Sequence, residues 1–264
     1  MASSNYGIKQ VGIVGGGQMG GGVAEVMAKA GLQTVIKEVN AELAEKSQAG
    51  IEKSLNRALE RGKLDQESHA AVLSNLSYTT DLADLASSDL VVEAVVESYE
   101  LKAQIFSELD EVVTSSEAVL ATNTSSIPII DIAMNTKRPE QVIGLHFFNP
   151  APVMKLVEVI PSVRTSESVI QNMTNFTTEV IEKTVVAAKD RAGFVVNMLL
   201  VPYMLAAMKM YEAGHATAED IDAGMKLGAA HPMGPLELSD MIGCLLYTSP
   251  SPRDRTRSRM PSSA

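Results

Sequence analysis

The sequence is poor in cysteine and in positive charge, and both shortages exclude classes of function. Cys244 is the only cysteine in 264 residues, which excludes an internal disulfide framework and a cysteine-rich metal site. The formal net charge of −10 at pH 7 argues against binding to nucleic-acid backbones or to anionic membrane surfaces. We therefore expect neither nucleic acid nor a membrane as a partner.

Long apolar runs and targeting segments are also missing. No run of about 18 apolar residues occurs, so the sequence predicts no membrane span. The first ten residues, MASSNYGIKQ, are too short and too polar for a signal peptide. We expect a soluble intracellular protein, and the compartment stays open between the cytoplasm, the mitochondrial matrix and the peroxisome.

Three common catalytic motifs do not occur either. The sequence has no G-x-x-x-x-G-K-S/T phosphate loop, no H-E-x-x-H zinc motif and no nucleophile elbow. Phosphoryl transfer, zinc proteolysis and serine hydrolysis therefore have no support, and we expect no metal site.

What the sequence does have is a glycine-rich turn after a short apolar run near the N-terminus. Gly15, Gly17 and Gly20 fit the pattern G-x-G-x-x-G, an alanine-rich helix follows, and a second apolar run ends at Glu38. Such a turn lets a pyrophosphate approach the backbone at the start of the helix. Glu38 lies 18 residues after Gly20, where a carboxylate binds a ribose 2′-hydroxyl and repels a 2′-phosphate. The stretch predicts dinucleotide binding and favours NAD over NADP.

Apolar runs then alternate with amphipathic helical segments up to about residue 188. This alternation predicts an α/β fold with a doubly wound, mostly parallel sheet of the Rossmann type over residues 1–188. The predicted strands beyond the first two are a short one at 76–78 and then 89–96, 118–121, 142–146, 153–160 and 184–187. From residue 189 to 244 only helices are predicted, beginning with the apolar segment 194–211. We expect a smaller, all-α second domain there, which is incomplete.

The last twenty residues, 245–264, differ in composition from the rest. They carry four arginines and one aspartate among serines and prolines, and apolar periodicity stops. This composition is typical of disorder. We interpret the segment as a non-native tail that replaces the true C-terminus.

Candidate catalytic side chains follow several of the predicted strands. His146 ends one strand and Glu158 lies in the next apolar run, while Ser125 follows the strand 118–121. Ligands of doubly wound sheets bind beyond the carboxyl ends of the strands. A His–Glu pair there fixes the tautomer of the imidazole and stabilises its protonated form, as a general base requires. The plainer alternatives are a structural histidine and a serine that only caps a helix.

Several segments together resemble the NAD-dependent L-3-hydroxyacyl-CoA dehydrogenases, a family that includes 3-hydroxybutyryl-CoA dehydrogenase. They occur in the family's order from about residue 10 to residue 243. The segments are GIVGGGQMGGGVA, DLVVEAVVES, ATNTSS, GLHFFNPAPVMKLVEVI, AGFVVNMLLVPY and HPMGPLELSD. The pair GLHFFNP and MKLVEVI is the most specific of these. Glu38 stands where many members have aspartate.

The resemblance implies a reaction and a set of roles. The reaction is the reversible oxidation of an (S)-3-hydroxyacyl-CoA to the 3-oxoacyl-CoA, in fatty-acid β-oxidation or butyrate-type metabolism. The implied catalytic residues are His146 as general base, Glu158 as its partner, and Ser125 and Asn197 as the groups that hold the substrate oxygen. The implied NAD-binding residues are Gly15, Gly17, Gln18, Met19, Gly20, Glu38, Glu97, Lys102 and Asn149. Ser54, Ser125 and one of the pair Arg61 and Lys63 would bind the acyl-CoA substrate.

Two alternatives stay open at this point. One is an NAD-linked dehydrogenase of a small hydroxy acid without coenzyme A, such as gulonate 3-dehydrogenase. The other is a non-catalytic protein of the crystallin type built on the same fold. The resemblance also implies a homodimer formed through the C-terminal helices, which the expected truncation puts in doubt for this chain.

Overall fold

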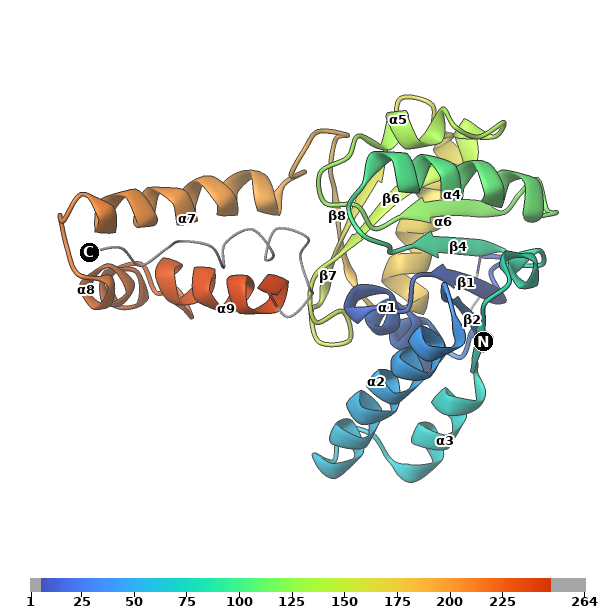
Figure 1. Ribbon diagram of the computed structural model, residues 1–264, viewed down its shortest axis with the longest axis horizontal. Coiled ribbons are helices and arrows are strands. Elements are labelled where there is room, and N and C mark those ends of the chain that lie inside the picture. The colour runs from blue at the N-terminus through green and yellow to red at the C-terminus, as the bar shows by residue number, and fades with distance from the viewer. Residues whose placement is uncertain (1–5, 248–264) are drawn as a thin grey trace, which may run out of the picture. The chain divides into compact units, whose positions relative to one another are not determined.

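An eight-stranded sheet forms the centre of the first of two compact units. The computed structural model describes residues 6–247, with side chains through residue 243 (Figure 1). The first unit extends to Val195 and the second begins at Val196. The strand order is β3-β2-β1-β4-β5-β6-β7-β8, and only the β6–β7 pair is antiparallel. The predicted mostly parallel, doubly wound sheet is confirmed.

The strands are short, with four to six residues each. They are β1 Gln10–Val14, β2 Gln33–Lys37, β3 Leu76–Thr79, β4 Leu90–Glu93, β5 Val119–Thr122, β6 Val142–Phe147, β7 Leu156–Pro161 and β8 Thr184–Ala187. Residues of β4, β5 and β6 are all buried, as expected for strands covered on both faces. The chain order reverses beside β1, whose neighbours are β2 and β4. Ligand sites of such sheets lie outside the carboxyl ends of the strands at this reversal.

Helices connect the strands of the first unit. They are α1 Gln18–Lys29, α2 Ala41–Glu60, α3 Gln66–Ser74, α4 Tyr99–Val112, α5 Ile129–Ala133 and α6 Glu167–Asn175, with the short turns η1 Leu82–Leu85, η2 Pro139–Gln141 and η3 Phe176–Val180. Several begin at a side-chain cap. Asn40, Asp65 and Ser98 each accept a hydrogen bond from the backbone N–H three residues ahead. Such caps satisfy one of the free N–H groups at the first turn.

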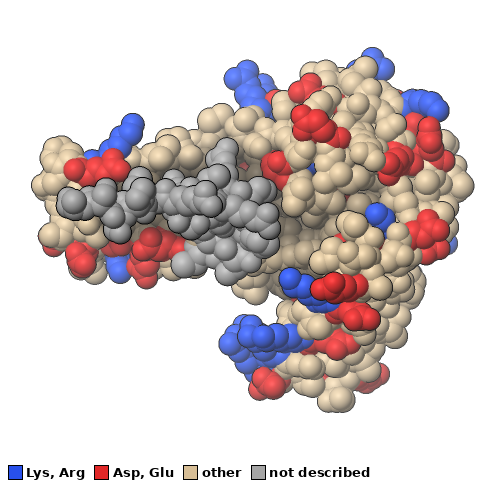
Figure 2. All heavy atoms as spheres, viewed as in Figure 1, with Lys and Arg blue, Asp and Glu red and all other residues tan. Residues whose placement is uncertain are grey.

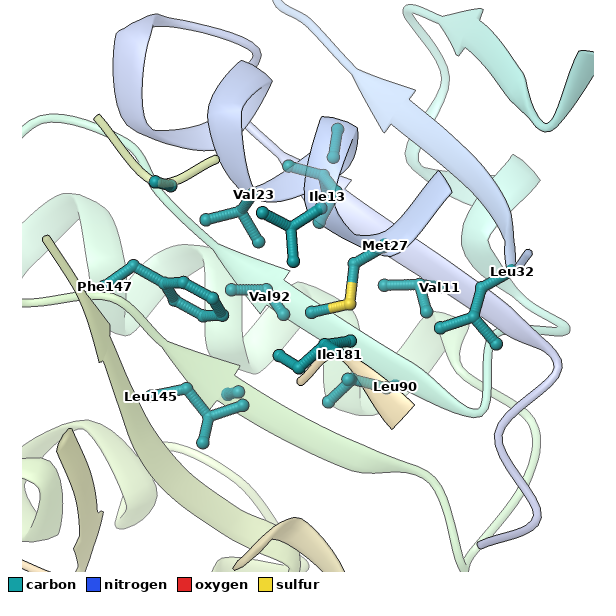
Figure 3. Close-up of a cluster of buried hydrophobic side chains, with 14 of the residues drawn as sticks. Val11, Ile13, Val23, Met27, Leu32, Leu90, Val92, Leu145, Phe147 and Ile181 are labelled. Carbon is teal, nitrogen blue, oxygen red and sulfur yellow. The ribbon is translucent and has the colours of Figure 1, made fainter. Parts of the chain in front are cut away.

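The hydrophobic core lies on both faces of the sheet. One cluster joins β1 and β4 to α1, α2, α3 and α6, and the other joins the opposite face to α4 and α5. Met27 of α1 points into the first cluster between Val11, Val92 and Ile181 (Figure 3). Burying a large apolar side chain contributes about 1.5–3 kcal/mol, so these layers hold the strand ends in fixed register.

The second unit consists of helices over the residues that the structure describes. They are α7 Val196–Glu212, α8 Ala218–Ala223, the turn η4 Gly224–Gly228 and α9 Pro235–Tyr247. The Asp222 carboxylate accepts the backbone N–H groups of Leu236 and Glu237, which ties the start of α9 to α8. None of the helices within residues 6–247 is long and apolar enough to cross a membrane.

Two boundaries differ from the sequence-based expectation. The first unit includes residues 189–195, because this segment is hydrogen-bonded to it: Asp190 caps α5 and the Gly193 N–H donates to the Ser125 carbonyl. At the other end, α9 continues through Tyr247, three residues into the expected tail. The rest of that tail, from residue 248, lies outside the described residues.

The glycine turn offers a direct test of local packing. A Cβ on Gly20 would lie 1.7 Å from the Gly15 carbonyl oxygen, whereas one on Gly17 would meet nothing within 4 Å. We expect Gly20→Ala to lower the free energy of unfolding by about 1–3 kcal/mol, since backbone must move. Gly17→Ala is the matched control, with an expected effect within about 0.5 kcal/mol. Denaturant midpoints measure both, and equal midpoints would show that this contact does not limit the turn.

Candidate active site

The glycine turn and Glu38 form one wall of a cavity at the carboxyl end of β1 and β2. Gly15 has φ +91° and its N–H donates to the Lys37 carbonyl at 2.9 Å, which brings the two strand ends together. The Gly16 N–H donates to Glu38 Oε1 at 2.6 Å. The cavity has a volume of about 420 Å³, and Gly17, Gln18, Glu38, Ser54 and Asn149 all lie on its lining.

This cavity fits the adenosine half of a dinucleotide. Gly16 and Gly17 line it without side chains, and a Cβ on Gly16 would lie 2.4 Å from the Ser47 hydroxyl. The Ser47 Oγ is buried and has no hydrogen-bond partner in the described part of the chain. A buried hydroxyl without a partner costs free energy, so a polar ligand in this cavity is favoured. Glu38 adds a carboxylate to the same lining.

Two hydrogen bonds from Lys183 hold the loop that carries Asn149. Lys183 Nζ donates to the Ala151 carbonyl at 2.8 Å and to the Met154 carbonyl at 2.7 Å. Burial lowers the pKa of Lys183, and the charge of Lys29 lowers it further, while Glu25 opposes both. Two carbonyl acceptors satisfy the ammonium and hold the loop against the dinucleotide cavity.

His146 and Glu158 form a buried pair across β6 and β7. The antiparallel register places the two residues directly opposite each other, with His146 Nδ1 2.7 Å from Glu158 Oε2. Their side chains are 5% and 0% exposed. Glu158 Oε1 also accepts the Val195 N–H at 3.0 Å. Because a carboxylate accepts, Nδ1 carries the proton and Nε2 of the neutral imidazole is left as the basic nitrogen.

The basic nitrogen of His146 faces Ser125. Ser125 Oγ lies 3.2 Å from His146 Nε2. The rings of Phe148 and Phe194 flank the imidazole, with centroids 4.7 and 5.4 Å away. The structure thus brings together three residues that the sequence analysis singled out. The two flanking aromatic rings were missed, although Phe148 lies in the quoted motif GLHFFNP.

Glu97 and Lys102 lie beside the Ser125 loop. Lys102 is buried, with Nζ 2.6 Å from Glu93 Oε1 and 3.5 Å from Glu97 Oε2. Burial raises the pKa of Glu97, but hydrogen bonds from Thr124 and the loop, together with the charge of Lys102, outweigh it and leave that pKa below its ordinary value. Glu97 is therefore ionised at neutral pH. Glu93 was missed by the sequence analysis, because nothing in a strand sequence reveals that its carboxylate has a buried partner.

A second cavity, of about 920 Å³, opens along α2 and has a basic lining. Lys53, Arg57, Arg61 and Lys63 line it together with Ser54. Figure 2 shows lysine and arginine side chains gathered near the C-terminal end of α2. The structure brings together all three predicted substrate residues of this region. Arg57 was missed, although it stands four residues before Arg61 and so lies on the same face of the helix.

Asn197 is the second residue of α7 and belongs to the second unit. Its proposed contact with the substrate oxygen stays a prediction. Within residues 6–243, no group of three or more His, Cys, Asp or Glu side chains is arranged to hold a metal ion.

Family models match nearly the whole chain. The model for the 3-hydroxyacyl-CoA dehydrogenase NAD-binding domain matches residues 10–191, and the model for the C-terminal domain of 3-hydroxyacyl-CoA dehydrogenase matches residues 193–256. These matches agree with the resemblance carried by the sequence motifs.

Individual relatives support the same assignment. The chain is 50% identical over 236 residues to 3-hydroxybutyryl-CoA dehydrogenase of Mycobacterium tuberculosis, which covers 89% of this chain and 82% of the relative. It is 43% identical over 242 residues to the mitochondrial hydroxyacyl-coenzyme A dehydrogenase of Sus scrofa, covering 89% and 76%. The crystal structure of (S)-3-hydroxybutyryl-CoA dehydrogenase PaaH1 from Ralstonia eutropha superposes with a TM-score of 0.86 at 40% identity, covering 89% and 82%. The chain therefore belongs to the 3-hydroxyacyl-CoA dehydrogenase family and is an NAD-dependent oxidoreductase.

Proposed function

We propose that the protein interconverts an (S)-3-hydroxyacyl-CoA and the 3-oxoacyl-CoA, with His146 as the general base. The observation that carries the proposal is the position of the imidazole, whose Nδ1 faces the buried Glu158 while Nε2 faces Ser125. A base with one protonated and one free nitrogen, fixed by a carboxylate, is ready to accept a proton at a defined place.

The proton transfer follows from this geometry. His146 Nε2 accepts the proton of the substrate hydroxyl during oxidation, and Ser125 Oγ, 3.2 Å from Nε2, donates a hydrogen bond to the same substrate oxygen. The imidazolium that forms is stabilised by the Glu158 carboxylate at 2.7 Å in a buried site. In the reverse direction the imidazolium returns the proton. NAD, when bound, supplies the acceptor for the hydride.

Four of the proposed NAD-binding residues line the first cavity, namely Gly17, Gln18, Glu38 and Asn149. We propose that the turn from Gly15 to Gly20, including Gln18 and Met19, holds the pyrophosphate and that Glu38 holds the adenosine ribose. Glu97, Lys102 and Asn149 are assigned to the nicotinamide half. Because Lys102 is only 1% exposed, it acts there by holding Glu97 more than by direct contact.

The basic cavity favours a coenzyme A thioester over a small free hydroxy acid. Ser54, Arg61 and Lys63 are the proposed contacts, and Arg57 and Lys53 add to the positive charge. Phosphate groups are bound by such clusters through charge-assisted hydrogen bonds. A free hydroxy acid leaves this cavity without a ligand.

A homodimer is the proposed assembly. Met198, Leu199, Val201 and Leu205 of α7 are large apolar residues that are 45–71% exposed in the single chain. Met198, Val201 and Leu205 are spaced by three and four residues and so share one face of the helix, and an exposed apolar face is typical of protein interfaces. The pathway assignments to β-oxidation or butyrate-type metabolism rest on the resemblance.

Replacement of the proposed base tests the mechanism directly. We expect His146→Gln to lower kcat with acetoacetyl-CoA and NADH by about 10²–10⁴-fold, the usual contribution of a general acid–base group. NADH affinity, measured by fluorescence titration, should stay near normal. His215→Gln, at an exposed histidine of the second unit, is the control. A kcat equal to that of the control would remove His146 from the mechanism.

The cofactor preference tests Glu38. We expect Glu38→Gln to reduce the ratio of kcat/KM for NADH over NADPH, because the repulsion of a 2′-phosphate is lost. The expected change is about tenfold, equivalent to ~1.4 kcal/mol. Glu42→Gln, which removes an exposed carboxylate in the first turn of α2, controls for general charge. An unchanged ratio in Glu38→Gln would contradict the assignment.

The basic cavity is tested with two substrates that share a reacting group. We expect the double variant Arg61→Gln/Lys63→Gln to raise KM for acetoacetyl-CoA about tenfold, as charge-assisted contacts to phosphate are lost. KM for acetoacetyl-pantetheine, which has no phosphate, should not change. Lys9→Gln, an exposed lysine before β1, is the control. Equal changes with both substrates would place the phosphates elsewhere, and faster turnover of free hydroxy acids would favour the alternative function.

A further inference from the structure

A single carboxylate accepts four hydrogen bonds from the loop that carries Ser125. Glu97 Oε1 accepts the backbone N–H of Ser125 at 2.9 Å and that of Ser126 at 3.0 Å. The same oxygen accepts the hydroxyls of Thr124 at 2.5 Å and Ser126 at 2.9 Å. Glu97 precedes α4 and the loop follows β5, so the contact joins segments 28 residues apart in sequence. Four donors converge on one oxygen, which fixes the direction of the loop.

Glu97 is itself held from the buried side. Its Oε2 lies 3.5 Å from Lys102 Nζ, and that ammonium is paired at 2.6 Å with Glu93 Oε1. Glu93 Oε2 accepts the hydroxyl of Thr122, at the end of β5. The chain of contacts therefore begins in the sheet and ends at the Ser125 backbone. Lys102 and Glu93 are almost fully buried, so the ion pair that supports Glu97 is shielded from solvent.

The far side of the loop has a weaker attachment. The Ser125 carbonyl accepts the Gly193 N–H at 3.3 Å. The Ser126 N–H has a second acceptor, Thr124 Oγ1, at 3.3 Å. Among the contacts of the described residues, the Ser125 N–H is assigned to Glu97. Loss of that carboxylate leaves Ser125 with its carbonyl contact to Gly193 and its side-chain contact to His146.

We propose that Glu97 is a positioning residue that sets Ser125 Oγ at hydrogen-bond distance from His146. The inference rests on the proposed function, which assigns His146 and Ser125 to the reaction, and it goes beyond a contact of Glu97 with NAD. A contact with NAD alone makes Glu97 important for cofactor affinity. A positioning role makes it important for turnover and for the order of the loop before any ligand binds.

The first experiment measures the order of the Ser125 loop by a readout that does not depend on enzyme activity. Amide hydrogen exchange of the unliganded protein is compared between the wild type, Glu97→Ala and Glu111→Gln. The last variant is the control, because it removes an exposed carboxylate near the end of α4. We expect the Ser125 and Ser126 amides to exchange at least about tenfold faster in Glu97→Ala, the factor for loss of a charge-assisted hydrogen bond. Amides of β5 and the Glu111→Gln control should stay unchanged. If the Ser125 amide of Glu97→Ala exchanged at the same rate as in the wild type, the proposal would be overturned.

The second experiment separates positioning from cofactor binding. We expect Glu97→Ala to lower kcat by about 10–10²-fold, the usual effect of misplacing a reacting group, while the NADH dissociation constant changes much less. Glu97→Gln keeps an oxygen acceptor and should restore part of the loss. In a cycle with Ser125→Ala, the Glu97→Ala effect should largely disappear. Independent effects of the two substitutions, or an effect confined to NADH affinity, would overturn the proposal.

The two experiments also separate this inference from the proposed function. An inactive wild-type protein on acetoacetyl-CoA would refute the proposed function, whereas the exchange measurement would still report on Glu97. An active wild type with an unaltered Glu97→Ala variant would refute only the inference. Unfolding midpoints of both Glu97 variants show that they are folded, and Glu97→Gln preserves the shape of the side chain if Glu97→Ala does not fold.

Discussion

The buried contact between His146 and Glu158 is the interaction on which the site depends. It exists because β6 and β7 are the one antiparallel pair in an otherwise parallel sheet. Residues directly opposite each other in such a pair have side chains on the same face and within contact distance. A parallel crossover would carry the chain away over a helix before it returned to the sheet. The reversal of one strand therefore places a carboxylate against the proposed base, with only the loop 148–155 between the two strands.

Buried charge is the cost of this arrangement, and the sheet compensates for it locally. Removing a carboxylate from water is unfavourable by several kcal/mol unless a partner and hydrogen bonds replace the solvent (of order 3–5 kcal/mol when one partner is deleted). The Glu158 carboxylate is hydrogen-bonded to His146 and to the Val195 N–H. The Glu93 carboxylate is hydrogen-bonded to Lys102 and to the Thr122 hydroxyl. Each carboxylate thus divides its two oxygens between partners from different segments. The polar groups at the strand ends are ordered by one another before a ligand arrives.

The sequence predicted those parts of the fold that depend on local pattern. The glycine turn, the first helix and Glu38 lie within 30 residues, so spacing alone defined the site that they form. His146, Glu158 and Ser125 were identified because strand ends in a doubly wound sheet share one edge. The segment between His146 and Glu158 is too short for a helical crossover, a signal of an antiparallel pair that the sequence analysis did not use.

What the sequence did not predict depends on contacts between distant segments. The partnership of Glu93 with Lys102 and the convergence of the Ser125 loop on Glu97 require the register of β4 and β5. The basic cavity lies between α2 and α3. Only the folded arrangement shows that Arg57 lines it together with Arg61 and Lys63. The sequence analysis began the second domain at residue 189, where predicted strands give way to predicted helices. The hydrogen bonds of the segment 189–195 to α5, Ser125 and Glu158 place it in the first unit instead.

That segment gives Glu158 a second contact besides the one with His146, the proposed base. Oε2 faces His146 Nδ1 while Oε1 accepts the Val195 N–H, immediately before α7 begins at Val196. The Phe194 ring packs against the imidazole, and Phe194 itself has φ +47°, a strained value for a bulky residue. Strain of this kind persists only where surrounding contacts over-determine the backbone. The same carboxylate that contacts His146 Nδ1 therefore also holds the last residues of the first unit.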